Sequence, residues 1–458
     1  MKILLMMPIN RSYVIMPSLG IGYIASVLRE SGHDVTILHC LQKNFTFGDF
    51  QNYIKNNDFD LIGIQMFTFD VTPTRKHIKI IRKFQPDTII VLGGYHPSGV
   101  HEKILKDYPR ADFALICETE IAFPELLSQI QSNSPNFQEV PNLIWRKGNK
   151  IIINPIEIVE DLDTIPFPAW DLMDPRNYPP MPHGGFFKSF PTAPIIITRG
   201  CPMECTFCAG KAVTTRRIRK RSIENVIKEM KFLKTNYGVR DFLIEDENFT
   251  LFKKLLTEFC ETLIKLKMNI AWSCPSGVRI DTLDEDRLKL MERSGCHSLA
   301  LGLEFGSQRI HNITKKHLSI KKIIEKMKLF NNVNIKTTGF FMFGIPGETK
   351  YEMLQTIGLS KLVNINRAQF NNFMPLPGSE LYKELMEKGM KGINHDHFFV
   401  HDVGYVPNGM TRKMIKNMQR RAYLEFYLRP KIIIGILKEI QSLKHFWALL
   451  TRFIDSLK

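Results

Sequence analysis

Three cysteines within eight residues carry the strongest chemical signal in this sequence. Cys201, Cys205 and Cys208 lie in the segment T-R-G-C-P-M-E-C-T-F-C. Thiolates on one short loop can hold three irons of a [4Fe–4S] cube, because cysteine sulfur binds such clusters. No fourth ligand lies nearby, so the fourth iron would be free to bind a small molecule. A zinc site would show paired C-x2-C units or cysteine with histidine, and the sequence has neither pattern here.

The other five cysteines are scattered at positions 40, 117, 260, 274 and 296. In a long chain that resembles a cytosolic protein, three clustered cysteines and five scattered ones indicate a metal site or a catalytic site rather than disulfides. We interpret the five scattered cysteines as small buried hydrophobic residues. The chain has 458 residues, 44% of them hydrophobic and 24% charged, which predicts two or three globular domains. The net charge of +16 favours polyanions, anionic membrane surfaces or acidic cofactors as partners, or reflects only a solvated surface.

The first 140 residues alternate short apolar runs with amphipathic stretches. This alternation predicts an open, doubly wound parallel sheet of the Rossmann or flavodoxin kind, whose ligands bind beyond the carboxyl ends of the strands. The loops expected to bind a ligand are therefore 8–19, 65–72 and 93–99. The expected strands are Ile3–Met7, Val35–His39, Leu61–Gln65, Thr88–Leu92 and Asp112–Cys117.

Residues 141–190 contain a turn signal, Lys147-Gly148-Asn149, between two apolar runs, which predicts a hairpin. A proline-rich passage follows and indicates an interdomain linker. From residue 191 to about 395 the alternation restarts, and six strand–helix units predict a partial barrel of the triosephosphate-isomerase type. Its expected strands are Ile195–Thr198, Asp241–Ile244, Ala271–Cys274, Ser298–Leu303, Thr337–Phe343 and Ala368–Phe373.

The tail, residues 396–458, is expected to be basic and helical. Apolar residues at alternating spacings of four and three predict one helix face, formed by Ile436, Ile440, Leu443, Trp447, Leu450, Ile454 and Leu457. This face either packs on the barrel or lies on a membrane surface. No apolar run reaches the length of a membrane span, and the short apolar run at Ile3–Met7 does not predict a signal peptide. We therefore expect a cytoplasmic protein, with peripheral contact at the inner face of the membrane as an option.

The C-x3-C-x2-C pattern, with aromatic Phe207 before its last cysteine, resembles the radical S-adenosylmethionine (SAM) superfamily. The resemblance implies that SAM chelates the open iron and is cleaved reductively to a 5′-deoxyadenosyl radical. The protein would position the cofactor and exclude water. A flavodoxin- or ferredoxin-type reductant would supply the electron.

Later segments extend the resemblance through residue 385 or so. Asp246 and Glu247 follow the second barrel strand and would lie near the methionine amino group of SAM, although an exposed acidic turn is the alternative. Arg279, after the third strand, is expected to contact a carboxylate, or to be a surface arginine. Glu304, after the fourth, resembles the residue that holds the ribose or amino group. The segment containing Gly344, Ile345 and Pro346 resembles the one that borders the adenine.

The amino-terminal domain is similar to that of the cobalamin-binding branch of the superfamily. The likeness rests on the segments 17–28, 32–35, 93–97 and 118–120, and Cys117 stands where relatives usually have glycine. A D-x-H-x-x-G motif, whose histidine would ligate cobalt, is absent from the sequence. The resemblance implies that the corrin lies between the two domains, near Ser18, Leu19, Gly20, Gln65, Thr68, Gly93, Gly94, His96 and Glu118.

The leading hypothesis is thus an enzyme with a [4Fe–4S] cluster, SAM and cobalamin that methylates an unactivated carbon of a small molecule. A second hypothesis keeps these cofactors but has oxidative cyclisation or ring rearrangement as its outcome, on a tetrapyrrole or lipid. A third is a non-catalytic iron–sulfur or corrinoid carrier. A tRNA methylthiotransferase would need three amino-terminal cysteines, and only Cys40 and Cys117 precede the linker. Nucleic-acid binding rests on charge alone and is not favoured.

Overall fold

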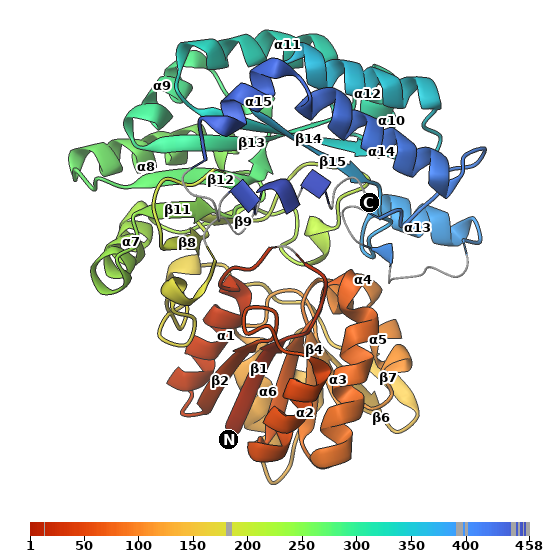
Figure 1. Cartoon of the computed structure of the whole chain (residues 1–458). Helices are drawn as coiled ribbons and strands as arrows, with labels where there is room; N and C mark the ends of the chain where they lie inside the picture. The colour runs from red at the N-terminus through yellow and green to blue at the C-terminus, as the bar shows by residue number, and fades with distance from the viewer. Residues whose placement is uncertain are drawn as a thin grey trace.

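The amino-terminal domain is built on a seven-stranded sheet of order β2-β1-β3-β4-β5-β6-β7 in this computed structural model (Figure 1). The structure describes residues 1–12, 14–179, 186–390, 397–398, 402–440, 446–447, 449–451 and 453–454. The first five strands are parallel, as predicted for a doubly wound domain, and the last two are antiparallel. They are β1 (Lys2–Met7), β2 (Asp34–His39), β3 (Leu61–Gln65), β4 (Ile89–Gly93), β5 (Phe113–Leu115), β6 (Leu143–Lys147) and β7 (Lys150–Ile153).

Alternating side chains of these strands form two hydrophobic layers. On β1, Ile3 and Leu5 face α1 (Leu19–Glu30) and α6 (Ala122–Gln131), whereas Leu4 and Met6 face the opposite helices. Those opposite helices are α2 (Phe47–Asn56), α3 (Val71–Phe84) and α5 (Lys103–Asp107). A short helix, α4 (Tyr95–Val100), follows β4 at the edge that faces the second domain (Figure 1).

The hairpin expected in the linker is instead an extension of the first sheet, because β6 pairs with β5. The proline-rich chain after it makes two 3₁₀ turns, Leu162–Thr164 and Pro175–Asn177, and packs against the second domain. Trp170 is buried there, and its indole nitrogen donates to Glu229 Oε1 at 3.0 Å. The linker is therefore attached to the barrel rather than free.

The second domain is a six-stranded parallel sheet of order β15-β14-β13-β12-β11-β8, which confirms the partial barrel. Its strands are β8 (Thr192–Ile195), β11 (Asp241–Ile244), β12 (Ala271–Val278), β13 (Cys296–Glu304), β14 (Lys336–Phe343) and β15 (Arg367–Asn372). β8 begins three residues before the predicted strand and contains Pro194, which an edge strand accommodates because one side of it makes no ladder hydrogen bonds.

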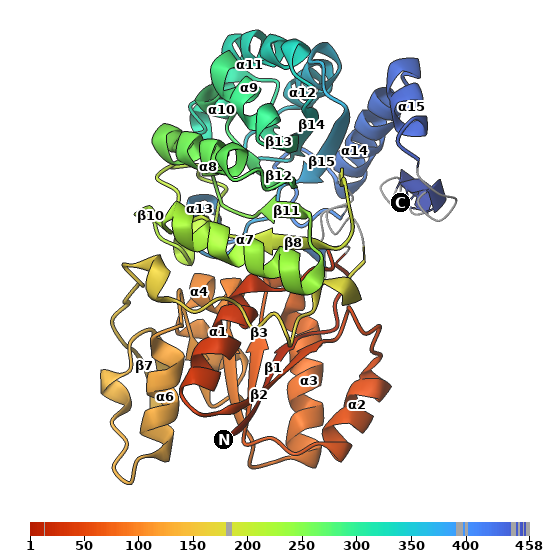
Figure 2. The ribbon, with the colours of Figure 1, turned by 90° about the vertical axis from the view of Figure 1, so that its left-hand side faces the viewer.

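Helices cover the outer face of this sheet (Figure 2). They are α7 (Ile223–Tyr237), α8 (Lys253–Lys265), α9 (Glu285–Arg293), α11 (Ile320–Met327) and α12 (Lys350–Leu362). Two further helices, α10 (Gln308–Ile313) and α13 (Glu380–Glu387), pack in a separate cluster with residues that follow the carboxyl ends of β13, β14 and β15. A separate two-residue pair, β9 (Thr198–Arg199) with antiparallel β10 (Arg219–Lys220), stands beyond the end of β8.

The edge strand β15 is covered by α14 (Arg412–Tyr427). The hydroxyl of Tyr427 accepts from the amide of Ala368 at 3.2 Å and donates to its carbonyl at 2.8 Å. The Gln419 side chain donates to the carbonyl of Phe370 at 2.7 Å. Side chains of α14 thus occupy edge groups that would otherwise be free to pair with another strand.

The tail departs from the single long helix expected over residues 436–457. The next helix, α15 (Pro430–Leu437), ends at Leu437. Glu439 then turns back to the barrel and forms ion pairs with Arg367 at 2.9 Å and Lys336 at 3.5 Å. Leu443 and Leu457 of the predicted face lie outside the described residues. Among the others, Trp447 is 61% exposed and Ile454 46% exposed.

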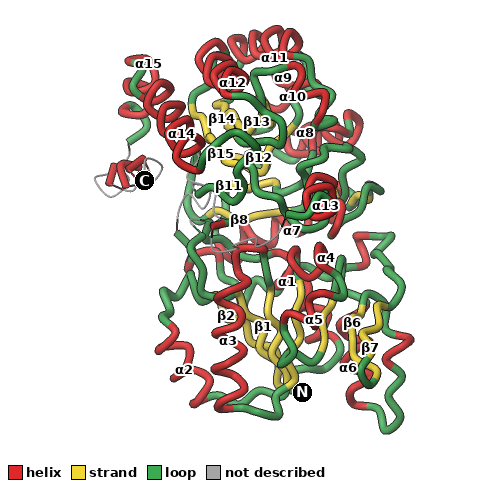
Figure 3. Tube along the Cα trace, turned by 90° about the vertical axis from the view of Figure 1, so that its right-hand side faces the viewer, coloured by secondary structure: helices red, strands yellow, loops and turns green. Residues whose placement is uncertain are grey.

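The two domains meet at the carboxyl ends of their strands (Figures 2 and 3). The contact is close: a Cβ on Gly99 would lie 2.4 Å from the carbonyl oxygen of Pro377, and a Cβ on Gly378 would lie 3.4 Å from the Cα of Gly99. Cys117 Sγ donates to the Ala212 carbonyl at 3.4 Å. The loops predicted to bind ligands in the two domains therefore face each other.

Candidate functional site

The cysteine loop leaves β9 and returns at β10, so that residues 200–218 form one excursion from the end of the first barrel strand. Gly200 opens it with φ of +98°, and a Cβ there would lie 2.2 Å from the carbonyl oxygen of Arg217. Only glycine fits this position, both for its backbone conformation and for the close approach. The amide of Thr206 donates to Thr314 O at 3.0 Å, and that of Leu381 donates to Thr206 O at 2.9 Å, which ties the loop to two later segments.

The three cysteines of this loop are free thiols. Cys201 and Cys205 are half-buried and Cys208 is exposed. Burial raises the pKa of the Cys201 and Cys205 thiols, and the nearby Lys316 ammonium opposes that effect. Within the described part of the chain no three His, Cys, Asp or Glu side chains converge on a single metal ion. Each thiolate of a cube binds a different iron, so the donor set fits three corners of a [4Fe–4S] cluster without such convergence.

Lys316 is a site residue that the sequence analysis missed. It lies in the loop after α10, yet its side chain is only 9% exposed, and its Nζ is 3.0 Å from Glu304 Oε1. A lysine in a loop is usually solvated, so sequence alone gave no signal. Its positive charge, placed beside the cysteines, suits a carboxylate ligand.

Asp246 and Glu247 follow β11 and point to different partners. Asp246, buried, accepts from the amides of Ile197 and Thr198, both at 2.8 Å, and from the Thr198 hydroxyl at 2.6 Å. Burial raises its pKa to about 7. Glu247 accepts from the Thr214 hydroxyl at 2.6 Å and the Gly200 amide at 3.2 Å. Both carboxylates therefore fix the base of the cysteine loop.

Asn248 adds an orphaned polar group at the same strand end. It is only 4% exposed, and neither atom of its side-chain amide has a hydrogen-bond partner in the described structure. Buried amides are nearly always paired, so this one fits contact with a polar ligand.

Arg279 and Glu304 are also engaged by protein groups. The Arg279 guanidinium forms a bidentate ion pair with the Asp281 carboxylate at 2.9 and 3.0 Å. It also donates to the carbonyl oxygen of Lys316 at 2.8 Å. It therefore orients the segment that carries Lys316. Glu304 adopts φ of +57° and pairs with Lys316. The backbone of Gly302 leaves room for that pair, since a Cβ there would lie 2.7 Å from Glu304 Oε1.

The segment with Gly344, Ile345 and Pro346 follows β14 and is held by a buried glutamate. Glu348 Oε2 accepts from the amides of Gly344 at 2.6 Å and Ile345 at 3.1 Å. Burial raises the pKa of Glu348 to about 8. Phe207 packs edge-on against Phe305, with ring centroids 6.0 Å apart. These contacts shape an apolar wall beside the cysteine loop.

In the amino-terminal domain, the predicted cobalamin residues lie at the same edge of the sheet. The Ser18 hydroxyl donates to Gln65 Oε1 at 3.1 Å, and Gly20 lies beside the Gln65 side chain. His96 Nδ1 is 3.4 Å from the Thr68 hydroxyl. Gly94, which follows Gly93, has φ of +100° against the backbone of Met66, where a side chain would clash.

Two of the predicted cobalamin residues have other surroundings. Leu19 packs into the hydrophobic cluster shared with the barrel. Glu118 is buried, and its carboxylate accepts from Arg219 at 2.5 and 2.6 Å and from the amide of Val159 at 3.0 Å. Cys117 is half-buried, unlike the other scattered cysteines, and its φ of +58° explains why glycine suits this position.

Three aromatic rings, also missed by the sequence analysis, form a stack at this edge. Phe67 stacks on Phe69 at 5.3 Å and on Tyr95 at 5.5 Å between centroids. Burial raises the pKa of Tyr95, and the nearby carboxylate of Glu247 and thiol of Cys208 act in the same direction. The stack therefore faces the cysteine loop across the domain interface.

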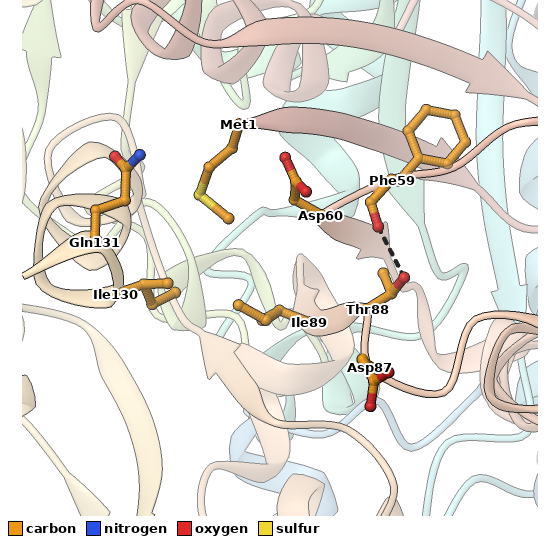
Figure 4. A pocket seen from close by; sticks show the side chains of 8 residues that line it. All are labelled: Met1, Phe59, Asp60, Asp87, Thr88, Ile89, Ile130 and Gln131. Carbon is orange, nitrogen blue, oxygen red and sulfur yellow. Dashed lines mark hydrogen bonds between the residues drawn. The ribbon is translucent and has the colours of Figure 1, made fainter.

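A surface hollow of about 630 Å³ lies at the opposite, amino edge of the first sheet (Figure 4). Its lining residues are Met1, Phe59, Asp60, Asp87, Thr88, Ile89, Ile130 and Gln131. Ligands of doubly wound sheets bind at the carboxyl edge, so we do not assign the candidate site to this hollow.

Comparison with known proteins matches each of the two domains to a family model. Residues 195–359 match the model of the radical SAM superfamily, and residues 8–127 match that of the B12-binding domain. An uncharacterized methyltransferase of Pyrococcus horikoshii is 29% identical over 95% of this chain and 94% of its own. The anaerobic magnesium-protoporphyrin IX monomethyl ester cyclase of Rubrivivax gelatinosus is 24% identical over 96% of this chain and 79% of its own.

The fold agrees with a solved structure of the same architecture. The radical SAM methyltransferase TsrM from Kitasatospora setae, solved with cobalamin and a [4Fe–4S] cluster, has a TM-score of 0.70 at 16% identity, covering 97% of this chain and 92% of that one.

Fold and site together define an iron–sulfur enzyme with a corrinoid-binding domain. The chain belongs to the cobalamin-binding branch of the radical SAM superfamily. Its cofactors are a [4Fe–4S] cluster, SAM and cobalamin.

Proposed function

We propose that this enzyme transfers a methyl group to an unactivated carbon of a small molecule. The observation that carries the proposal is the direct apposition of the cysteine loop and the carboxyl edge of the B12-binding sheet, seen in the contact of Cys117 with Ala212. When bound, the cluster and SAM supply a 5′-deoxyadenosyl radical and cobalamin supplies a methyl group. A substrate held between the domains could reach both.

The chain's own residues would bind and orient these groups. Cys201, Cys205 and Cys208 would hold three irons. Lys316 would pair with the SAM carboxylate, because its ammonium lies near the cysteines. Asn248 would donate to or accept from the polar groups of SAM, because its buried amide has no protein partner in the described structure. The aromatic stack of Phe67, Phe69 and Tyr95 would present an apolar face toward the corrin and exclude water from the space between the domains.

The test is anaerobic reconstitution with iron, sulfide and hydroxocobalamin, followed by desalting and addition of dithionite and SAM. We expect 5′-deoxyadenosine and retained corrinoid from the wild type. Cys205→Ala should lose deoxyadenosine formation, whereas Cys40→Ala, which also removes one thiol but from the hydrophobic core, should keep it. A reducible cluster that yields no deoxyadenosine would contradict the radical reaction. Formation of deoxyadenosine without retained corrinoid would contradict the role of cobalamin as a second cofactor.

Oxidative cyclisation is the second candidate, favoured by the near full-length similarity to the cyclase. The two reactions differ in what becomes of SAM. Methyl transfer consumes a further SAM to recharge cobalamin and releases S-adenosylhomocysteine, whereas cyclisation releases none. Candidate substrates of both classes, tetrapyrroles and lipids, should be screened with SAM carrying a labelled methyl group, and label in the product would establish methylation.

We also propose that an acidic flavodoxin or ferredoxin delivers the electron. Lys211, Arg216, Arg217 and Lys220 are exposed on the cysteine loop or its stem, and charge complementarity there would guide such a partner. The double variant Arg216→Glu/Arg217→Glu should slow deoxyadenosine formation with reduced flavodoxin but not with dithionite. Equal slowing with both reductants would argue against docking.

The tail supports a peripheral membrane contact from the cytoplasmic side. No helix in the described part of the chain is long and apolar enough to cross a bilayer. Leu428, Ile434 and Leu437 are 60%, 52% and 56% exposed around α15, beside Lys431 and Lys438. Exposed apolar residues with flanking lysines suit an anionic membrane surface. Ile434→Glu/Leu437→Glu should reduce binding to anionic liposomes, and Leu362→Glu, equally exposed on α12, should not.

A further inference from the structure

Four charged side chains form a buried cluster between the domains, which we call the interdomain quartet: Glu118, Glu120, Arg199 and Arg219. The two glutamates follow β5 of the B12-binding domain, and the two arginines lie in β9 and β10 of the barrel. Arg219 Nη1 is 2.5 Å from Glu118 Oε2, Arg199 Nη2 is 2.7 Å from Glu120 Oε1, and Arg199 Nη1 is 3.6 Å from Glu118 Oε1. None of the four side chains is more than 9% exposed.

The arginines of the quartet stand directly opposite each other. Arg199 and Arg219 are cross-strand partners in the two-residue ladder of β9 and β10. Like charges at opposite positions destabilise a strand pair, and buried charges without partners are costly. This ladder is nevertheless the stem of the cysteine loop, since residues 200–218 lie between its strands. The glutamates of the other domain supply the two negative charges that allow the stem to close.

Further contacts bind the stem to the same place. Arg219 Nη1 donates to the carbonyl of Val159 at 2.6 Å and Nη2 to that of Thr214 at 3.2 Å. The Arg199 guanidinium lies 5.2 Å from the ring centroid of Tyr23 on α1. Arg199 is two residues before Cys201, so a shift of Arg199 reaches the first cluster ligand through one intervening residue, Gly200.

We propose that Glu118 and Glu120 are positioning residues for the cluster, because they hold the cysteine loop closed from the B12-binding domain. They act through Arg199 and Arg219 rather than by touching a cofactor. This inference rests on the proposed function only for the identity of the cluster. It makes a property of the barrel, retention of its iron, depend on two carboxylates of the other domain.

The test compares Glu120→Gln and Glu118→Gln with the wild type after anaerobic reconstitution. Rates of iron loss to a chelator are measured together with hydrogen exchange of the amides of residues 198–220. We expect iron loss to accelerate about tenfold or more, which corresponds to about 1.4 kcal/mol of lost loop stability. Exchange should rise in the stem and loop before it rises in the barrel core.

A matched control is available in the same loop. Arg217 pairs with Glu160 at 2.6 Å, but both side chains are more than half exposed, so Glu160→Gln should leave iron retention and exchange unchanged. The double variant Glu118→Gln/Arg219→Gln removes one charge of each sign and also the opposition of the two arginines. It should therefore retain iron better than Glu118→Gln alone.

Several outcomes would overturn the proposal. Wild-type iron retention and exchange in both single variants would do so, as would an equal loss in Glu160→Gln, or failure of the double variant to recover. If the single glutamine variants do not fold, Glu120→Asp, which keeps the charge but shortens its reach, gives the same comparison. A wild type that holds a cluster yet makes no deoxyadenosine would refute the proposed function and leave the quartet's role standing.

Discussion

Both domains fix a ligand-facing loop with a buried aspartate, but the aspartates act over different ranges. In the B12-binding domain, Asp70 accepts from the amide of Phe67, three residues earlier, at 2.8 Å and from Asn10 at 2.9 Å. In the barrel, Asp246 accepts from Ile197 and Thr198, which are 49 and 48 residues away. Burial raises the pKa of each to about 7. Asp70 mainly closes a local turn, whereas Asp246 joins the ends of two strands beneath the cysteines.

This difference predicts that long-range contacts contribute more than local turns to iron retention by the cysteine loop. Among the substitutions considered, Gly200→Ala should have the largest effect. A Cβ there meets backbone in a left-handed residue, so we expect a loss of about 4 kcal/mol in unfolding free energy, with loss of iron. Gly148→Ala is the control, because that hairpin glycine also has positive φ but nothing within 4 Å. It should cost about 1 kcal/mol by chemical denaturation. Equal costs would remove the distinction.

Asp246→Asn should come next, with a loss of about 3 kcal/mol, because an amide presents only one acceptor oxygen to three donors. Asp70→Asn should cost about 1 kcal/mol and leave iron binding intact. Denaturant unfolding of the reduced apoprotein and iron analysis after reconstitution would measure both. A larger loss for Asp70→Asn would reverse the comparison.

The pH dependence of stability sharpens the comparison further. The pKa of Asp246 is raised from 3.8 to about 7 in the folded protein, so its protonated form is favoured there. The contribution of Asp246 to the free energy of unfolding is fully present below about pH 4 and is lost as the pH rises through about 7. The stability difference between wild type and Asp246→Asn should therefore shrink from pH 4 to pH 8. Urea unfolding across this range would test it, and a difference that grows would refute the sign.

The smallest effect is expected at Cys117, a local backbone feature. Replacing it with glycine removes the strain of φ of +58° but also the weak hydrogen bond to Ala212. We expect a net gain of about 0.5 kcal/mol and unchanged iron retention. A loss above about 1 kcal/mol would show that the thiol contact outweighs the strain.

Sequence reasoning succeeded where the signal was local and periodic. The alternating faces of β1 and the short C-x3-C-x2-C spacing depend on neighbouring residues, so the two domains and the cysteine loop were predictable. It did not anticipate Lys316 or the interdomain quartet, since these depend on groups brought together from distant segments. Asp246 illustrates the limit: its residue type suggested a ligand contact, but its partners 48 and 49 residues earlier are visible only in the fold.

The close packing of Gly99 and Gly378 across the interface has a consequence for how such enzymes can be recombined. A single carbon added to Gly99 would clash with Pro377 of the other domain, whereas one added to Gly378 would clash with Ala212 of its own domain. A chimera that joins the barrel of this chain to the B12-binding domain of a relative would need glycine at the position of Gly99, whatever the two active sites contain. The domains of this chain are thus expected to be inherited as a matched pair rather than exchanged as independent modules.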